Sequence, residues 1–143
     1  MNPEVTVRKA ELEDEVPIEV LMSTYFLDIE GTEIDDFVVA TIDNRMVGAA
    51  CLEIGKIPEI HSIAVHPNYR GKGIGRLLLD SLIADIEEQE FLFTRTTSPA
   101  FFEKAGFIRL DDTEKKELWD DCAGCNRFNN CKQSVLRLEI KKR

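Results

Sequence analysis

The stretch that decides the fold is Ile63-Ala64-Val65-His66-Pro67-Asn68-Tyr69-Arg70-Gly71-Lys72-Gly73-Ile74-Gly75-Arg76. An apolar run typical of a buried strand leads into a glycine-rich loop, and a long helical pattern begins at Ile74. The first N–H groups of a helix have no acceptor within the helix and carry the positive end of its dipole. Because glycines let an anion approach those groups closely, this stretch predicts a phosphate or diphosphate site.

The cations around this loop support the same prediction. Arg70, Lys72 and Arg76 lie within it, although the formal net charge of the chain is -9. We expect Arg70 and Arg76 to contact phosphate, and the alternative is that either side chain only faces solvent. The overall balance of 18 basic and 27 acidic residues argues against nucleic acid as a partner, because a phosphate backbone needs a basic face.

Length and hydropathy place the chain among compact soluble domains. Its 143 residues are enough for one hydrophobic core, so we expect a single domain over residues 1–143. The apolar runs are short, so we predict no membrane partner, no secretory signal and a cytoplasmic location. The sequence is compatible with a homodimer.

The rest of the chain predicts strands mixed with a few helices. A first strand at 5–8 precedes a helix that Asp14 would cap, and strands at 37–42 and 46–52 flank a hairpin turn at Asp43-Asn44-Arg45. In the helix that begins at Ile74, the expected apolar face is Leu77, Leu78, Leu82 and Ile86. Further strands are expected at 57–65, 91–94 and 135–140. We predict a mixed α/β (α+β) fold with helices on the faces of one sheet.

Three separated motifs resemble one family. The loop lacks the Ser or Thr of a Walker motif and the glycine spacing of a dinucleotide fingerprint. Instead, Arg70-Gly71-Lys72-Gly73-Ile74-Gly75 resembles the pyrophosphate-binding signature of the GNAT superfamily of acyl-CoA N-acyltransferases. The segments Ala64-Val65-His66-Pro67 and Phe101-Phe102-Glu103-Lys104-Ala105-Gly106-Phe107 are similar to its fourth strand and to a later motif, and the hairpin with Val47-Gly48 matches its second and third strands.

This resemblance implies the GNAT fold, a mostly antiparallel sheet splayed between its fourth and fifth strands, with acetyl-CoA in the opening as co-substrate. The N–H groups of Gly71, Lys72, Gly73, Ile74, Gly75 and Arg76 would hold the pyrophosphate. The pantetheine arm would pair with Ile63, Ala64 and Val65 in the manner of an added strand.

Transfer of an acetyl group to an amine needs a base, because an ammonium with a pKa of about 10.4 is neutral in only roughly one molecule in two thousand at pH 7. The resemblance assigns this role to Glu59, and His61 is expected on the same strand face. Either could act directly or through water. The alternatives are a solubilising edge carboxylate for Glu59 and a packed or solvent-facing ring for His61. A backbone N–H near residues 63–65 is expected to stabilise the thioester oxygen as it becomes negative.

One position departs from the family pattern. The tyrosine that usually protonates the leaving thiolate in this family is replaced here by Phe102. The proton could come from Tyr25, Tyr69, Ser98 or water, or the thiolate could leave without one. The departure keeps open a different function, an acetyl-CoA-binding sensor or regulatory module without transfer activity.

A cysteine-bearing segment at 111–133 precedes the last strand. Its pattern from Trp119 through Cys122, Cys125 and Phe128 to Cys131 resembles the C-terminal signature of N-acetylglutamate synthase-like amino-acid acetyltransferases. The three thiols could hold zinc or an iron-sulfur centre, but they lack an obvious fourth ligand, and small buried or redox-active thiols are the favoured interpretation.

Together these features predict an acetyl-CoA-dependent N-acetyltransferase for a small amine, with an amino acid ahead of a polyamine, a peptide or an antibiotic. We expect direct attack in a ternary complex, because no cysteine lies on the predicted fourth strand to carry the acetyl group. The segment 27–36 is acidic, which disfavours an acceptor with several carboxylates and leaves the acceptor open.

Overall fold

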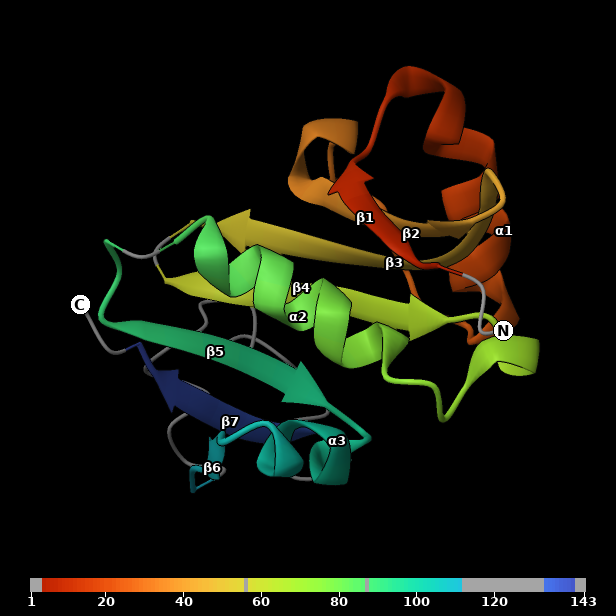
Figure 1. Cartoon of the computed structure of the whole chain (residues 1–143). Coiled ribbons are helices and arrows are strands. Elements are labelled where there is room, and N and C mark those ends of the chain that lie inside the picture. Colours follow the sequence, from red (N-terminus) through yellow and green to blue (C-terminus); the bar gives the residue numbers. More distant parts are fainter. Residues whose placement is uncertain (1–3, 56, 87, 112–132, 141–143) are drawn as a thin grey trace. The chain divides into compact units, whose positions relative to one another are not determined.

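The computed structural model describes residues 4–55, 57–86, 88–111 and 133–140, and Figure 1 labels its main elements. The strands are β1 (Thr6–Lys9), β2 (Phe37–Ile42), β3 (Arg45–Ile54), β4 (Pro58–Val65), β5 (Phe91–Thr96), β6 (Ile108–Arg109) and β7 (Ser134–Glu139). The helices are α1 (Glu15–Thr24), α2 (Ile74–Ala84) and α3 (Pro99–Lys104), and short 3₁₀ turns form η1 (Leu12–Asp14), η2 (Ile34–Asp36) and η3 (Pro67–Tyr69). The chain divides into two compact units, residues 1–53 with 60–86 and residues 54–59 with 87–143.

The first unit contains strands in the order β1-β2-β3-β4. Strand β2 pairs antiparallel with both β1 and β3, and Val39 lies opposite Ala49. The β2–β3 turn has positive φ at Asp43 (51°) and Asn44 (65°), the backbone of a two-residue hairpin turn that suits the twist of its strands. The predicted hairpin is therefore confirmed.

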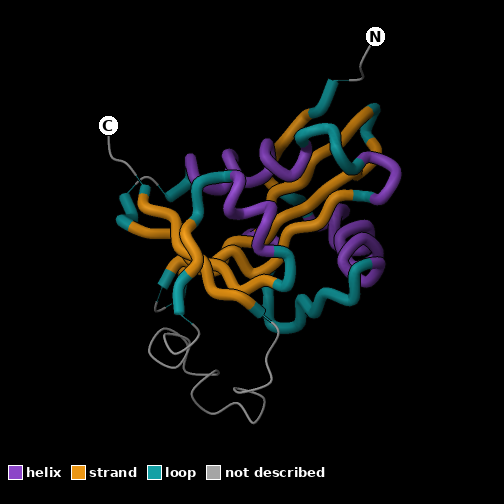
Figure 2. The backbone as a smooth tube through the Cα atoms, turned by 90° about the horizontal axis from the view of Figure 1, so that it is seen from below, coloured by secondary structure: helices purple, strands orange, loops and turns teal. Residues whose placement is uncertain are grey.

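Helices α1 and α2 lie on opposite sides of these strands (Figure 2). Helix α1 packs Ile18, Leu21 and Met22 into a core cluster with side chains such as Val39 and Ala49. Helix α2 contacts the other face, where a Cβ at Gly48 would come 3.0 Å from Leu78 Cδ1. Side chains of neighbouring strand residues point to opposite faces, which explains why the strand segment 48–49 serves both helices.

One residue of the predicted helix faces was wrong. Leu77 is 44% exposed, whereas the predicted Leu78 and Leu82 are buried together with Ile74 and Leu79, because each helical residue is rotated by about 100° from the last and Leu77 lies at the margin of the buried face. Asp14 is the N-cap residue of α1, as predicted, but its side chain makes no capping bond. Its carboxylate accepts hydrogen bonds from Arg8 at 2.7 and 3.0 Å and from the Glu11 N–H at 2.7 Å.

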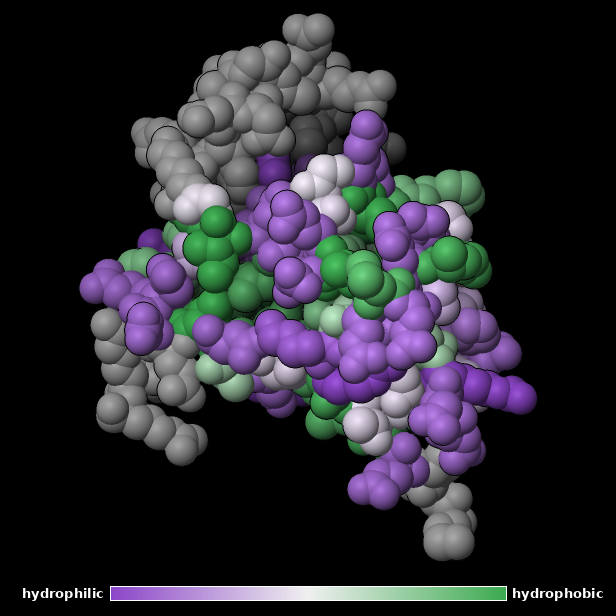
Figure 3. All heavy atoms as spheres, turned by 90° about the horizontal axis from the view of Figure 1, so that it is seen from above, coloured by the Kyte–Doolittle hydropathy of each residue, from purple (hydrophilic) through white to green (hydrophobic). Residues whose placement is uncertain are grey.

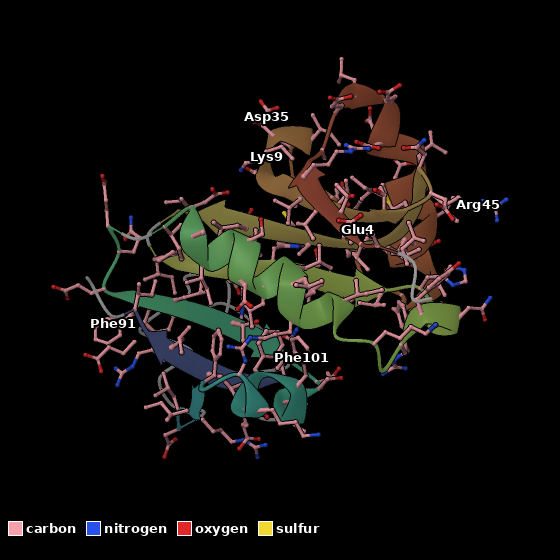
Figure 4. All side chains as sticks on the ribbon, in the orientation of Figure 1. Glu4, Lys9, Asp35, Arg45, Phe91 and Phe101 are labelled. Carbon is pink, nitrogen blue, oxygen red and sulfur yellow. The ribbon has the colours of Figure 1, made fainter. Side chains whose placement is uncertain are left out.

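The second unit contains β5, β7 and β6, and β7 pairs antiparallel with both neighbours. Phe91, at the start of β5 and labelled in Figure 4, has the Arg137 guanidinium 4.6 Å from its ring centroid. Phe93 and Val135 are buried together. Helix α3 follows Ser98 and ends before Gly106, whose φ of 101° is the left-handed conformation that favours glycine.

The fold class is confirmed, as an α/β fold of mostly antiparallel strands with helices. The single domain and the opening between the fourth and fifth strands stay predictions. Polar residues cover much of the surface seen in Figure 3. In the described part of the chain, no helix has the length and apolar character needed to cross a membrane.

Candidate functional site

The turn out of β4 is fixed by backbone hydrogen bonds. The His66 N–H donates to the Val47 carbonyl at 2.7 Å, and the Tyr69 N–H donates to the His66 carbonyl at 2.8 Å. His66 Nδ1 accepts from the Asn68 N–H at 3.1 Å. These bonds set the position from which the chain enters the glycine loop, a name used here for residues 70–75.

Two residues of the glycine loop have left-handed backbones. The φ angles are 78° at Gly71 and 80° at Gly73, and a Cβ added at either glycine would meet no heavy atom within 4 Å. Gly73 precedes α2 and has no side chain to cap it, and the Leu77 N–H makes the first bond of the helix, at 3.2 Å to the Gly73 carbonyl. The N–H groups of residues 74–76 therefore have no acceptor within the helix. They follow Gly73, where the absence of a Cβ leaves the space open. This geometry fits a bound pyrophosphate.

Gly48 helps to position this helix start, which the sequence analysis missed. A Cβ added at Gly48 would lie 3.0 Å from Leu78 Cδ1, 3.2 Å from Ile74 Cγ2 and 3.3 Å from the Ala64 carbonyl oxygen. Any larger residue would push against α2 and β4 together. A glycine inside a strand is a signal of close approach, and here the approaching groups come from α2 and β4.

The three cations of the loop differ in their contacts. The Arg70 guanidinium lies 5.9 Å from the Tyr25 ring centroid, and Lys72 Nζ lies 5.6 Å from that of Tyr69. Arg76 Nε is 3.0 Å from Asp80 Oδ1, in a pair of which both members are about half exposed. Such a pair contributes only about 0.3–0.5 kcal/mol, so Arg76 can exchange Asp80 for a phosphate at small cost.

Tyr25 connects the end of α1 with the end of β4. Its hydroxyl donates to the Val65 carbonyl oxygen at 2.5 Å, and its ring packs against the core cluster of α1. To act as the acid for a leaving thiolate, Tyr25 would have to give up this bond. The geometry therefore favours a positioning role for this residue.

The half-buried and buried residues of β4 alternate after Glu59. His61, Ile63 and Val65 are half-buried, whereas Ile60, Ser62 and Ala64 are buried. His61 thus lies on the strand face shared with Ile63 and Val65, and its Nδ1 is 3.3 Å from Ser62 Oγ.

Glu59 lies in the second unit and is only 6% exposed. Arg95 Nε donates to Oε2 at 2.8 Å and Arg95 Nη2 donates to Oε1 at 3.2 Å, which makes a two-pronged ion pair. Burial rules out the alternative of a solubilising edge carboxylate. The two hydrogen bonds fix the orientation of the carboxylate, and each oxygen keeps a second lone pair that can accept a further hydrogen bond.

Phe102 is part of the core of the second unit. It is 3% exposed, and its ring centroid is 5.0 Å from that of Phe101 and 5.3 Å from that of Phe107. Ser98, another candidate acid, uses its N–H to donate to Thr96 Oγ1 at 2.9 Å.

The predicted thiol site falls outside the described residues, since Cys122, Cys125 and Cys131 lie at 112–132. Within the described ranges, no group of three or more His, Cys, Asp or Glu side chains has the arrangement of a metal site.

Comparison with known proteins decides the family. Residues 33–109 match the family model described as an acetyltransferase (GNAT) domain. The chain belongs to the GNAT acetyltransferases. It is 30% identical over 108 residues to an uncharacterised N-acetyltransferase of Chlorobaculum tepidum, a match that covers 72% of this chain and 70% of that protein. The family assignment makes this chain an acetyl-CoA-dependent acyltransferase.

Two further proteins that resemble the chain are longer. The amino-acid acetyltransferase of Escherichia coli is 34% identical over 98 residues, which cover 62% of this chain and 22% of the enzyme. The solved structure of N-acetylglutamate synthase from Neisseria gonorrhoeae with coenzyme A and N-acetyl-glutamate has a TM-score of 0.79 at 21% identity, over 99% of this chain and 36% of that chain. This structural likeness shows the GNAT fold. The matched region therefore spans 22% of the Escherichia coli enzyme and 36% of the Neisseria gonorrhoeae chain.

Proposed function

We propose that this GNAT chain transfers the acetyl group of acetyl-CoA to the primary amine of a small molecule, with an amino acid as the first choice, by direct attack in a ternary complex. The observation that carries the proposal is the open space beside Gly71 and Gly73 at the start of α2. The backbone N–H groups of residues 71–76 hold the pyrophosphate, and residues 63–65 pair with the pantetheine arm. Arg70 and Arg76 add phosphate contacts.

Glu59 and His61 supply the base. The amine loses its proton to one of them, directly or through water, while the new N–C bond forms and the C–S bond of the thioester breaks. The proton on the departing sulfur comes from water or from another donor than Phe102, whose side chain has no hydroxyl. Arg95 keeps the Glu59 carboxylate oriented through its two hydrogen bonds.

The choice of an amino acid as acceptor rests on likeness. The Escherichia coli relative is named an amino-acid acetyltransferase, and the pattern from Trp119 to Cys131 resembles the signature of N-acetylglutamate synthase-like enzymes. All three relatives have enzyme names, which gives no support to the alternative of an acetyl-CoA sensor.

The test is an amine screen with acetyl-CoA, in which amino acids, polyamines and short peptides are followed by mass detection and by release of free CoA. The proposal expects a mass increase of one acetyl group on at least one amino acid, with matching CoA release. Binding of acetyl-CoA at micromolar strength with no amine acetylated would contradict it and favour the sensor.

The base is tested separately with Glu59→Gln, His61→Ala and Arg95→Lys. Loss of a positioned base lowers kcat by about a hundredfold or more and flattens the acidic side of the pH-rate profile. Arg95→Lys keeps the charge but not the two-pronged geometry that orients Glu59, so it should lower kcat by a smaller factor than Glu59→Gln. An unchanged profile in both Glu59→Gln and His61→Ala would move the base role elsewhere.

A further inference from the structure

The outward side of helix α1 is apolar. Val16 and Val20 are 65% and 61% exposed, and Leu12, in the 3₁₀ turn that leads into the helix, is 76% exposed. Val16 and Val20 are four positions apart, so they lie on the same side of the helix, one turn from each other. Ile18 and Met22 pack into the core on the opposite side. We call Leu12, Val16 and Val20 the outer face of α1.

Helix propensity does not explain the valines of the outer face. Valine loses side-chain entropy in a helix, and Glu or Lys forms an exposed helix position better. The two hydroxyl groups that follow add little polarity to this side, because Ser23 Oγ and Thr24 Oγ1 both donate to the Val20 carbonyl, at 2.8 and 3.0 Å. Neighbouring apolar residues that a fold leaves exposed are typical of a contact with another molecule.

The chain around the outer face carries only negative charge. Residues 10–36 contain ten carboxylates and no Lys, Arg or His. Hydrogen bonding with Glu11 raises the pKa of Glu13 above its ordinary value, and repulsion from the Glu11 and Asp14 carboxylates raises it further, whereas Arg8 opposes the shift. The carboxylates before α1 therefore repel one another, and cations of a bound partner would relieve that repulsion.

A recess of about 180 Å³ lies between α1 and the segment that leads into β2. Its lining includes three carboxylates, those of Glu15, Glu19 and Glu30, and apolar side chains such as Ile29 and Ile34. Glu15 and Glu19 each directly precede a valine of the outer face. Lys and Arg bury their methylene stems on apolar surface and keep the charged group at a polar edge. The recess therefore suits a Lys or Arg side chain of a molecule that packs on the outer face.

Charge decides between the possible occupants of the outer face. A second copy of this chain, packed through the same face, would bring two sets of carboxylates together, which is repulsive. The cytoplasmic surface of a membrane is negative and would also repel this region. A partner with cations on both sides of an apolar stripe is attracted instead, and an amphipathic helix has this form.

We propose that the outer face of α1 docks a basic amphipathic helix of a partner protein. The apolar side chains of that helix pack on Leu12, Val16 and Val20. Its lysines or arginines meet the surrounding carboxylates, and one of them enters the recess. This contact uses none of the residues assigned above to acetyl-CoA or to the base.

The test uses a fluorescein-labelled synthetic amphipathic helix of leucine, alanine and lysine, followed by fluorescence anisotropy. Wild type binds this peptide with a Kd in the micromolar range, as small transient interfaces do, and the Kd rises as salt is added. The same peptide with glutamate in place of lysine does not bind, because its charge matches that of the outer face region.

Two double variants separate the apolar part of the contact from the charged part. Val16→Ala with Val20→Ala keeps all charges and places better helix formers, and it raises the Kd for the peptide by about tenfold, because apolar area is lost from the contact. Glu15→Gln with Glu19→Gln raises this Kd by about fivefold and reduces its dependence on salt. Ile108→Ala is the matched control, because Ile108 is 56% exposed outside α1, and it leaves the Kd unchanged.

The melting temperature and the Kd for CoA stay at the wild-type values in the valine variant, so a weaker contact is not a loss of fold. Failure of the lysine peptide to bind wild type would overturn the inference. Equal binding by the glutamate peptide would do the same, and so would an unchanged Kd in the valine variant, because charge alone would then explain the binding.

Two further measurements on wild type test the occupant. Sedimentation shows no self-association through the outer face, and vesicles of anionic lipid do not bind the protein. Self-association that the valine variant loses would assign the outer face to a second copy, and vesicle binding that it loses would assign the face to a membrane. Either result would overturn the inference.

Discussion

The glycine loop and the turn after α1 use the same left-handed backbone for opposite purposes. In the glycine loop, Gly71 and Gly73 have φ angles of 78° and 80°, and the space beside both is open. In the turn, Phe26 has a φ of 57° and extends an exposed ring. Glycine leaves open the space in which the proposed pyrophosphate approaches the backbone, whereas Phe26 keeps a side chain at the end of a helix. The conformation alone therefore does not indicate a function, and the residue that occupies it does.

The largest expected effect is that of Gly73→Asp. A carboxylate in the open space would face the pyrophosphate, so the Kd for CoA should rise by about a hundredfold or more in calorimetry. The matched control is Gly31→Asp, because Gly31 has a φ of 86° and equally open space outside the loop. Gly73→Asp and Gly31→Asp strain the backbone to a similar extent. An equal Kd for CoA in the two variants would therefore contradict a pyrophosphate site at Gly73.

A second prediction separates glycines that admit a ligand from glycines that admit a neighbouring element. Gly48→Ala forces a Cβ against Leu78, Ile74 and the Ala64 carbonyl, so the free energy of unfolding should fall by about 1–3 kcal/mol. Because this shift moves the start of α2, CoA affinity should fall by about tenfold. Gly55→Ala is the control, since a Cβ there meets no atom within 4 Å. Full stability in Gly48→Ala, measured by denaturant unfolding, would contradict the assignment.

Substitutions at Tyr25, in the turn after α1, are expected to have a smaller effect. Tyr25→Phe removes the hydrogen bond to Val65 and keeps the ring under Arg70, so stability should fall by about 1 kcal/mol. The KM for the acceptor should rise while the Kd for CoA stays unchanged. Tyr25→Leu also removes the ring and should weaken CoA binding as well. Identical kinetics in the two variants would show that the Arg70 contact has no role.

The smallest effect concerns the other end of α1. Hydrogen bonding to the Arg8 guanidinium holds the pKa of Asp14 below its ordinary value, with the Glu11 N–H assisting and burial opposing. A carboxylate with a lowered pKa stabilises the fold at pH values above the usual Asp pKa, and this contribution is lost as pH falls through the folded value. Asp14→Asn should therefore cost about 1 kcal/mol at pH 7 and reduce the acid sensitivity of unfolding.

The kinetic constants of Asp14→Asn should match wild type, because Asp14 lies at the end of α1 away from the turn. A changed acceptor KM would show that the whole helix, and not the turn alone, sets the geometry of Tyr25.

The structural features that the sequence predicted correctly are those that neighbouring residues determine. Asp43 and Asn44 tolerate positive φ, so the hairpin was predictable, and the glycine loop follows from the spacing of its glycines. Long-range pairs were beyond prediction, since Glu59 and Arg95 are separated by 36 positions and no pattern links them. Phe26 was missed because phenylalanine gives no signal for a left-handed turn. Asp14 is the predicted N-cap of α1, but its carboxylate bonds to Arg8 and not to the helix, a long-range pairing that no local pattern indicates.

The most direct test of the account is a titration of the ¹⁵N-labelled protein with CoA, followed by the amide resonances of Gly71, Gly73 and Gly75. The account predicts that these amides shift most as CoA is added. Unmoved glycine-loop amides in the presence of bound CoA would contradict it.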